Sequence, residues 1–173
     1  MKVFVGGVLM IFAFVSSSVA QDAKQSASPK NTEPFLLRAI TQDDKNYELK
    51  WADLAKLPRR DVKGKTHDGA EATFSGVELR EVLKLAGVKF GKEAKGAHLK
   101  SYLLVEAADD YRVVFAMSEL EPDMTDKVIL LADKRDGKPL SKEEGNIRLV
   151  VPDEKKQARW VRQVIALKIK SAN

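Results

Sequence analysis

From residue 35 to residue 169 the sequence alternates between short apolar segments and polar turns, and this alternation limits the fold more than any other feature. Segments this short predict strands, because a strand needs only about four to eight residues and a helix about ten or more. We predict about nine strands and a few short helices. The helices do not alternate regularly with the strands, which excludes a doubly wound sheet and a helical bundle. The pattern predicts a mixed α+β domain with a twisted, partly barrel-like sheet.

Apolar or alternating runs bounded by turn residues give the strand positions. The predicted strands are 35–40, 47–49, 59–65, 71–74, 102–108, 111–117, 127–132, 147–151 and 164–169. A short helix is predicted at 51–57 and a longer one at 77–86. Ser75 and Glu78 have the spacing of a capping box at the start of the longer helix. Gly87 follows its predicted end, where a glycine in the left-handed conformation commonly terminates a helix. Single helical turns are predicted at 118–121 and 141–145, and one or two helical turns at 155–160.

The first twenty residues have the pattern of an export signal. Lys2 is the only charge before Asp22, residues 3–15 are apolar, and Ser18 and Ala20 supply small residues for cleavage after Ala20. The alternative is an uncleaved membrane anchor, but the apolar run is short against the roughly 20 residues of a membrane span. We therefore predict a signal peptide at 1–20, a periplasmic or secreted protein, and no stable membrane anchor after cleavage.

Residues 21–33 contain no large apolar side chain and predict a flexible linker, which leaves 34–173 as the folded domain. The chain has no cysteine, so disulfides, cysteine-ligated zinc, iron–sulfur clusters and thiol nucleophiles are excluded. The net charge is +5, but aromatic residues are only 7% and the predicted compartment holds no nucleic acid. We expect no nucleic-acid partner.

Five segments resemble, in the same order, the motifs of one family. They are Phe74-Ser75-Gly76-Val77-Glu78-Leu79 with Leu83 and Ala86-Gly87; Asp110-Tyr111-Arg112; Leu131-Ala132 with Asp136-Gly137-Lys138-Pro139-Leu140; Gly145-Asn146-Ile147-Arg148-Leu149-Val150-Val151-Pro152; and Arg159-Trp160-Val161. Together they resemble the oxidoreductase molybdopterin-binding domain, the fold of sulfite oxidases and of periplasmic methionine-sulfoxide reductase catalytic subunits. The resemblance covers about residues 57–169 and implies that fold, with molybdopterin as the cofactor to consider and no haem.

The chain departs from the family at the position that matters most for chemistry. In catalytic members a single cysteine thiolate shortly before the helix binds molybdenum, whereas the corresponding stretch here, 62–69, contains no cysteine. A soft thiolate cannot be replaced by Lys or Thr without changing the metal chemistry. The strand entry also reads Asp109-Asp110-Tyr111, without the usual Gly, and Asn146 replaces the Pro of the Gly-Pro pair. The chain therefore resembles a small exported, stand-alone branch of the family.

The resemblance implies a cofactor-binding role for six residues. His67 and Asp68 lie in a turn on the side where the family places its cofactor; the alternative is a type I′ or bulged turn without function. For Asp110 and Tyr111, the resemblance implies that they line the cofactor cleft. The alternative is that Asp110 is a turn residue and Tyr111 a buried aromatic, both without a binding role. Strand alternation places Arg148 on the face opposite Ile147 and Leu149, where it is an edge or pocket residue.

Arg159 belongs to a basic cluster with Lys155, Lys156 and Arg162 around Trp160. On a helix, Lys155, Arg159 and Arg162 share one face and make an anion site; the alternative is a solvated basic face with Trp160 in the core. We expect His98, in a polar segment, to be solvent-exposed. The two histidines have no metal-binding spacing, so we predict no metal site and assign no catalytic residue.

Two functions remain open. The missing thiolate favours a non-catalytic or divergent module that binds a small anionic ligand or pterin. The alternative is an active molybdopterin-dependent periplasmic oxidoreductase that works with a redox partner.

Overall fold

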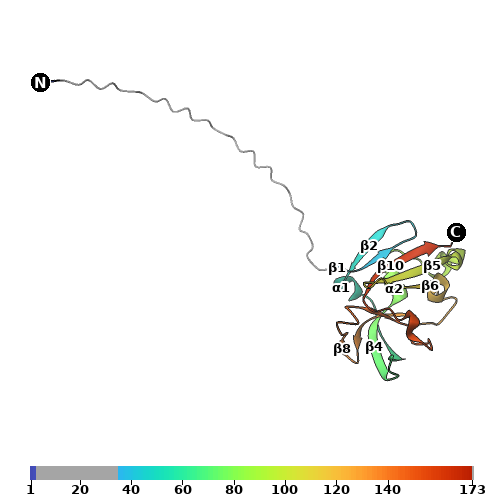
Figure 1. Ribbon diagram of the computed structural model, residues 1–173. Helices are drawn as coiled ribbons and strands as arrows, with labels where there is room; N and C mark the ends of the chain where they lie inside the picture. Colours follow the sequence, from blue (N-terminus) through green and yellow to red (C-terminus); the bar gives the residue numbers. More distant parts are fainter. Residues whose placement is uncertain (3–34, 173) are drawn as a thin grey trace. The chain divides into compact units, whose positions relative to one another are not determined.

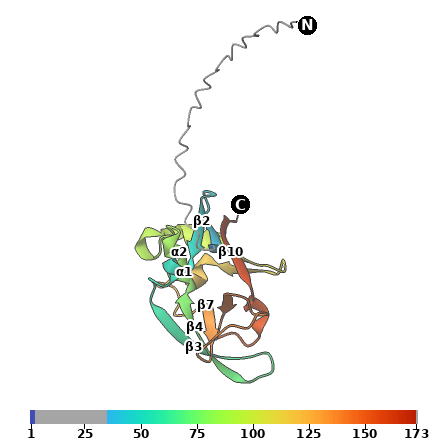
Figure 2. The ribbon, with the colours of Figure 1, turned by 90° about the vertical axis from the view of Figure 1, so that its left-hand side faces the viewer.

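The computed structural model describes residues 1–2 and 35–172, so the predicted signal peptide and linker lie almost wholly outside the described residues. Within this part the strands form two open sheets of five strands each, neither closed into a barrel. The first sheet lies at one end of the domain and the second at the other (Figures 1 and 2). The predicted α+β class, with a mixed sheet and few short helices, is confirmed.

The first sheet has the order β2-β1-β10-β5-β6. Its β1–β10 pair is parallel and its other pairs are antiparallel. Arg38 lies opposite Ala166 in the parallel pair, so the last strand of the chain lies between the first strand and β5. The strands are β1 (Phe35–Ile40), β2 (Asn46–Lys50), β5 (Ser101–Ala107), β6 (Arg112–Ala116) and β10 (Val164–Ser171).

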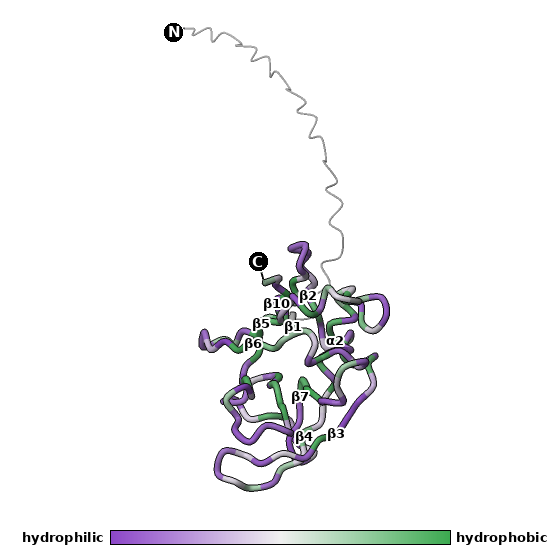
Figure 3. The backbone as a smooth tube through the Cα atoms, turned by 90° about the vertical axis from the view of Figure 1, so that its right-hand side faces the viewer, coloured by the Kyte–Doolittle hydropathy of each residue, from purple (hydrophilic) through white to green (hydrophobic). Residues whose placement is uncertain are grey.

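The second sheet has the order β3-β4-β7-β8, and β9 also pairs with β7. All its pairs are antiparallel. Its edge strand β3 carries five charged residues among its seven and is hydrophilic over most of its length (Figure 3). The strands are β3 (Arg59–Lys65), β4 (Glu71–Glu78), β7 (Leu130–Arg135), β8 (Lys138–Pro139) and β9 (Arg148–Val150).

The helices are short and lie in the connections. Helix α2 buries Leu79, Val82 and Leu83, and truncating one such leucine to Ala typically costs about 2–5 kcal/mol. Within the described part, no helix is both long and apolar enough to cross a membrane. The helices are α1 (Trp51–Leu54), α2 (Leu79–Leu85) and the 3₁₀ turns η1 (Gly91–Glu93), η2 (Lys95–Lys100), η3 (Met117–Leu120) and η4 (Gln157–Arg159).

The start of α2 differs from the sequence prediction. β4 continues through Glu78, which lies opposite Leu130 of β7, so the helix begins at Leu79 rather than at residue 77. Ser75 lies within β4, and no side chain caps the helix, so the predicted capping box is wrong. Pairing with β7 prolongs the strand beyond the point that the local sequence indicates. The predicted helix end is confirmed, because Gly87 has a φ of +80°.

Two other predicted elements have different bounds in the structure. The strand predicted at 127–132 begins at Leu130 and reaches Arg135, where it pairs with Lys138. The helical turns predicted at 155–160 reduce to the single 3₁₀ turn η4. A single turn cannot place Lys155, Arg159 and Arg162 on one helical face, so that prediction is wrong.

Candidate functional site

A cleft of about 1000 Å³ lies between β3, the β3–β4 turn and the segment that precedes β10. Trp160 and Arg148, both buried, belong to its wall, and charged side chains of β3 and of residues 152–162 surround it. The lining includes Lys63, Gly64, Lys65, His67, Arg148, Glu154, Lys155, Lys156, Trp160 and Arg162.

The cleft has an excess of positive charge. Five exposed cations line it, and none of them forms an ion pair with any described residue. Its acidic lining residues are Glu71 and Glu154, and Glu154 is already paired with Arg159. Low-dielectric walls with one sign of charge attract counter-ions, so the cleft favours an anionic ligand. The five cations are Lys63, Lys65, Lys155, Lys156 and Arg162.

Arg148 is the buried cation of the cleft, with a side chain only 6% exposed. Strand β9 holds it opposite Ala132 of β7. Its Nη1 donates to Glu144 Oε1 at 2.5 Å, and its guanidinium carbon lies 5.2 Å from the Phe74 ring centroid and 5.5 Å from that of Trp160. Burial lowers the pKa of Arg148, and its hydrogen bond to Glu144 opposes that shift.

One edge of the Arg148 guanidinium has no protein partner. Among residues 35–172, its Nε is the one enclosed side-chain nitrogen or oxygen without a hydrogen bond, and Nη2 also forms none. Nε–H and Nη2–H point the same way along one edge of the planar group, the edge that binds a carboxylate or phosphate with two parallel hydrogen bonds. A buried unpaired donor costs about 1–3 kcal/mol, so an oxyanion on this edge would remove a penalty.

Trp160 is a fixed wall rather than a mobile stacking platform. Its Nε1 donates to Val151 O at 2.8 Å, and its ring meets Phe74 edge-on, with centroids 5.5 Å apart. Gly64 of β3 lies directly against the ring, since a Cβ built there would be 2.5 Å from Trp160 Cη2. The ring is 6% exposed, which agrees with the interpretation of Trp160 as a core residue.

The structure separates His67 from Asp68. Gly69 N donates to Thr66 O at 2.9 Å and Thr66 N to Ala70 O at 2.7 Å, and of this turn only Gly69 has a positive φ, +85°. These two hydrogen bonds define a bulged turn and not a type I′ turn. His67 is exposed and lines the cleft. Asp68 does not line it; the hydroxyl of Thr66 donates to its carboxylate and lowers its pKa.

Asp110 and Tyr111 lie in the β5–β6 turn and do not line the cleft. Asp110 has a φ of +65°, as a tight turn requires. Tyr111 is 48% exposed rather than buried, so the alternative of a buried aromatic is wrong. Its hydroxyl donates to Ala158 O at 2.5 Å, which ties the β5–β6 turn to the segment that lines the cleft.

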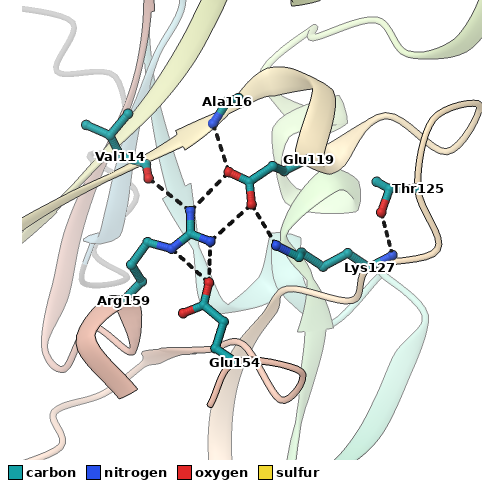
Figure 4. Close-up of polar contacts among 7 residues, drawn as sticks. All are labelled: Val114, Ala116, Glu119, Thr125, Lys127, Glu154 and Arg159. Carbon is teal, nitrogen blue, oxygen red and sulfur yellow. Dashed lines mark hydrogen bonds and ion pairs between the residues drawn. The ribbon is translucent and has the colours of Figure 1, made fainter. Parts of the chain in front are cut away.

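Arg159 is held outside the cleft lining by two carboxylates (Figure 4). Its Nη1 and Nη2 donate to the oxygens of Glu119 at 3.0 and 3.1 Å, and its Nε donates to Glu154 at 2.8 Å. Its guanidinium carbon also lies 4.3 Å from the Phe115 ring centroid. The other basic residues of the predicted cluster do line the cleft.

Sequence reasoning missed Lys63 and Lys65 as site residues. Their signal was present, because alternation along β3 places both lysines on one face with Gly64 between them. It also misplaced His98, which is 8% exposed rather than solvated, because η2 packs against η3. Within the described residues, no three His, Cys, Asp or Glu side chains cluster as metal ligands.

A family model for the oxidoreductase molybdopterin binding domain matches residues 25–173. The chain belongs to this family. Among solved structures, it is similar to the sulfane dehydrogenase SoxCD from Paracoccus pantotrophus, with 24% identity and a TM-score of 0.60. That match covers 79% of this chain but only 38% of the other, and it shows a common fold. A search of curated proteins found no match.

The cleft of this molybdopterin-binding domain fits the cofactor only in part. The orphaned Nε of Arg148 and the unpaired lysines suit an anionic group such as the phosphate of a pterin. No thiolate is present to bind molybdenum, because the chain has no cysteine. The donor set does not fit the thiolate-bound metal of catalytic members, so we derive no redox step at this site.

Proposed function

We propose that this chain is an exported, non-catalytic molybdopterin-binding-like domain that binds a small anionic ligand or a pterin in the Arg148 cleft. The observation that carries the proposal is the Nε/Nη2 edge of Arg148, whose donors have no partner among the described residues although the side chain is buried. The five exposed cations around it support an anion. The signal-like pattern of residues 1–20 supports export to the periplasm or the medium.

The missing cysteine supports the non-catalytic part of the proposal. Molybdenum is bound through a thiolate in catalytic family members, and neither Lys nor Thr in residues 62–69 replaces a soft sulfur ligand. His67, in the same turn, is a single exposed imidazole without a second ligand nearby among the described residues. A cleft that has a buried arginine with unpaired donors and lacks a thiolate ligand suits binding without electron transfer.

The deciding experiment measures molybdenum and pterin in the protein purified from the periplasm of a host that makes the cofactor. Elemental mass spectrometry gives the metal, and fluorescence after oxidation gives the pterin. Pterin without metal, or neither, supports the binding module. About one metal and one pterin per chain would overturn it in favour of the alternative, an active periplasmic oxidoreductase with a redox partner, and His67 would be the first candidate ligand to mutate.

Inorganic phosphate tests the anion site itself. With Trp51→Phe as the background, Trp160 is the only tryptophan and its fluorescence reports on the cleft. Arg148→Lys keeps the charge but loses the two-pronged edge, so phosphate affinity should fall about tenfold or more, since hydrogen bonds to charged groups contribute about 1.5–3 kcal/mol. The matched control is Arg159→Lys, whose side chain does not line the cleft. Equal affinities in both variants would contradict the assignment.

A further inference from the structure

A second cavity, of about 610 Å³, shares no lining residue with the Arg148 cleft. It lies between the β1–β2 turn, the segment after α2, the 3₁₀ turn η2 and the strand β10. Part of its lining is buried and apolar: Ala86, Ala94, Met117 and Ile169. Its size is within the roughly 300–1000 Å³ that small-molecule sites occupy.

His98 is a buried polar residue of this lining, and its imidazole ring is held in one orientation. Its Nδ1 is 3.0 Å from Glu121 Oε2, and both side chains are almost fully buried, at 10% and 3% exposure. Glu121 is fixed in turn, because its Oε1 accepts a hydrogen bond from Gly91 N at 2.7 Å. The Phe90 ring meets the imidazole edge-on at 5.2 Å. A carboxylate that holds Nδ1 fixes both the orientation and the tautomer of an imidazole.

The other ring nitrogen, Nε2, is not held by Glu121. His98 lines the cavity, whereas Glu121 does not. Nε2 has no hydrogen-bond partner among the described residues, and it is not enclosed in the way that Arg148 Nε is. Because Glu121 holds Nδ1, Nε2 is the ring nitrogen that is left to form a hydrogen bond with a ligand.

The charges around this cavity cancel, in contrast to those of the cleft. Asp43 pairs with Lys45 at 2.8 Å, and Lys89 pairs with Glu93 at 2.9 Å. These are all the Asp, Glu, Lys and Arg residues of the lining. With no unpaired ion, the cavity gives no electrostatic preference to an anion or a cation. Its buried apolar residues and the buried His98 favour a neutral molecule with one polar group.

We propose that this cavity is a second binding site, for a small neutral, mainly apolar molecule with a hydroxyl group that hydrogen-bonds to His98 Nε2. Tyr47, whose hydroxyl forms no hydrogen bond with the described residues, lines the same cavity and is a second polar anchor. The site is independent of the proposed function, because no residue is common to the two linings.

Phenol is the probe, because it combines a flat apolar body with one hydroxyl donor. The experiment follows the ring nitrogens of the ¹⁵N-labelled protein by NMR during a phenol titration. The chain has only two histidines, so exposed His67 is an internal reference. We expect a saturable shift of the His98 Nε2 resonance, with a dissociation constant on the order of 1 mM, and no saturable shift at His67.

Two phenylalanine substitutions on η2 test the site without removing His98. Ala97 is exposed and lines the cavity, so Ala97→Phe should narrow it and weaken phenol binding at least about tenfold. Leu99 is 69% exposed and lies outside the lining, so Leu99→Phe should bind phenol as the unaltered chain does. Arg148→Lys should also leave phenol binding unchanged. The absence of a saturable shift at His98, or equal affinities in Ala97→Phe and Leu99→Phe, would overturn the proposal.

Discussion

Arg159 donates to both carboxylate oxygens of Glu119, with Nη1–Oε1 at 3.0 Å and Nη2–Oε2 at 3.1 Å. The pair also covers the outer edge of β6, because Arg159 Nη1 donates to Val114 O and Ala116 N donates to Glu119 (Figure 4). An uncovered strand edge is a site for unwanted pairing with other chains. This geometry gives Arg159 a structural role, although its sequence position belongs to a family motif.

Replacement of Arg159 should therefore reduce stability more than anion binding. Arg159→Met leaves Glu119 and Glu154 half-buried without their shared cation, and we expect a loss of about 2 kcal/mol in the free energy of unfolding. Urea unfolding measures it, and the phosphate affinity of the cleft should change less than twofold. A loss of affinity as large as that of Arg148→Lys would show that Arg159 acts in the cleft.

Acid should destabilise the domain through Glu119. Burial alone would raise the pKa of this carboxyl, but hydrogen bonds from Arg159 and Lys127 outweigh it and lower the pKa from 4.5 to about 2. A carboxyl with a lowered pKa stabilises the folded state above pH 4.5, and this contribution disappears as the pH falls towards 2. We expect it to be on the order of 1 kcal/mol, because the side chain is partly exposed.

The measurement is the free energy of unfolding from pH 7 to pH 2 for Glu119→Gln. This variant should be less stable than the unaltered chain at pH 7 and should have a flatter pH dependence between 4.5 and 2. Asp126→Asn, at an exposed carboxylate without an ion pair in the described part of the chain, is the control and should keep the original slope. Parallel curves for Glu119→Gln and the unaltered chain would refute the assignment.

Glu144 and Arg148 should be strongly coupled in stability. Arg148→Met leaves the buried Glu144 carboxylate with Arg135 at 3.4 Å as its remaining cation, so we expect a loss of about 3 kcal/mol. The double variant Arg148→Met/Glu144→Gln removes both charges. Its loss in the free energy of unfolding should be smaller than that of Arg148→Met by at least about 1 kcal/mol. Urea unfolding of the full mutant cycle measures the coupling, and strict additivity would contradict it.

Gly64 should be required for the packing of Trp160. A Cβ there would lie 2.5 Å from Trp160 Cη2, so Gly64→Ala must displace a ring held by its hydrogen bond to Val151. We expect a loss of about 1–3 kcal/mol and a changed Trp160 emission in the Trp51→Phe background. Gly96→Ala, with no heavy atom within 4 Å of its Cβ position, should be close to neutral. A neutral Gly64→Ala would mean that the ring has room to move.

The sequence by itself determined the class of fold and most of the strands. β1 and β3 have the predicted bounds because period-2 alternation and turn residues are local signals. The order of five motifs indicated the family, and the absence of cysteine excluded a thiolate ligand without any coordinates. It also indicated Arg148 as an edge or pocket residue and a basic cluster of Lys155, Lys156, Arg159 and Arg162. All of these except Arg159 line one cleft.

Only the tertiary structure decided which charges are free and which are paired. Arg148 and Arg159 each belong to a family motif. Arg148 lines the cleft and its Nε has no hydrogen-bond partner among the described residues, whereas Arg159 pairs with Glu119, forty residues earlier in the chain. His98 appeared solvated until the packing of η2 on η3 buried it beside Glu121. Burial and ion pairing between distant residues depend on how the sheets and turns pack, and local patterns carry no information about that packing.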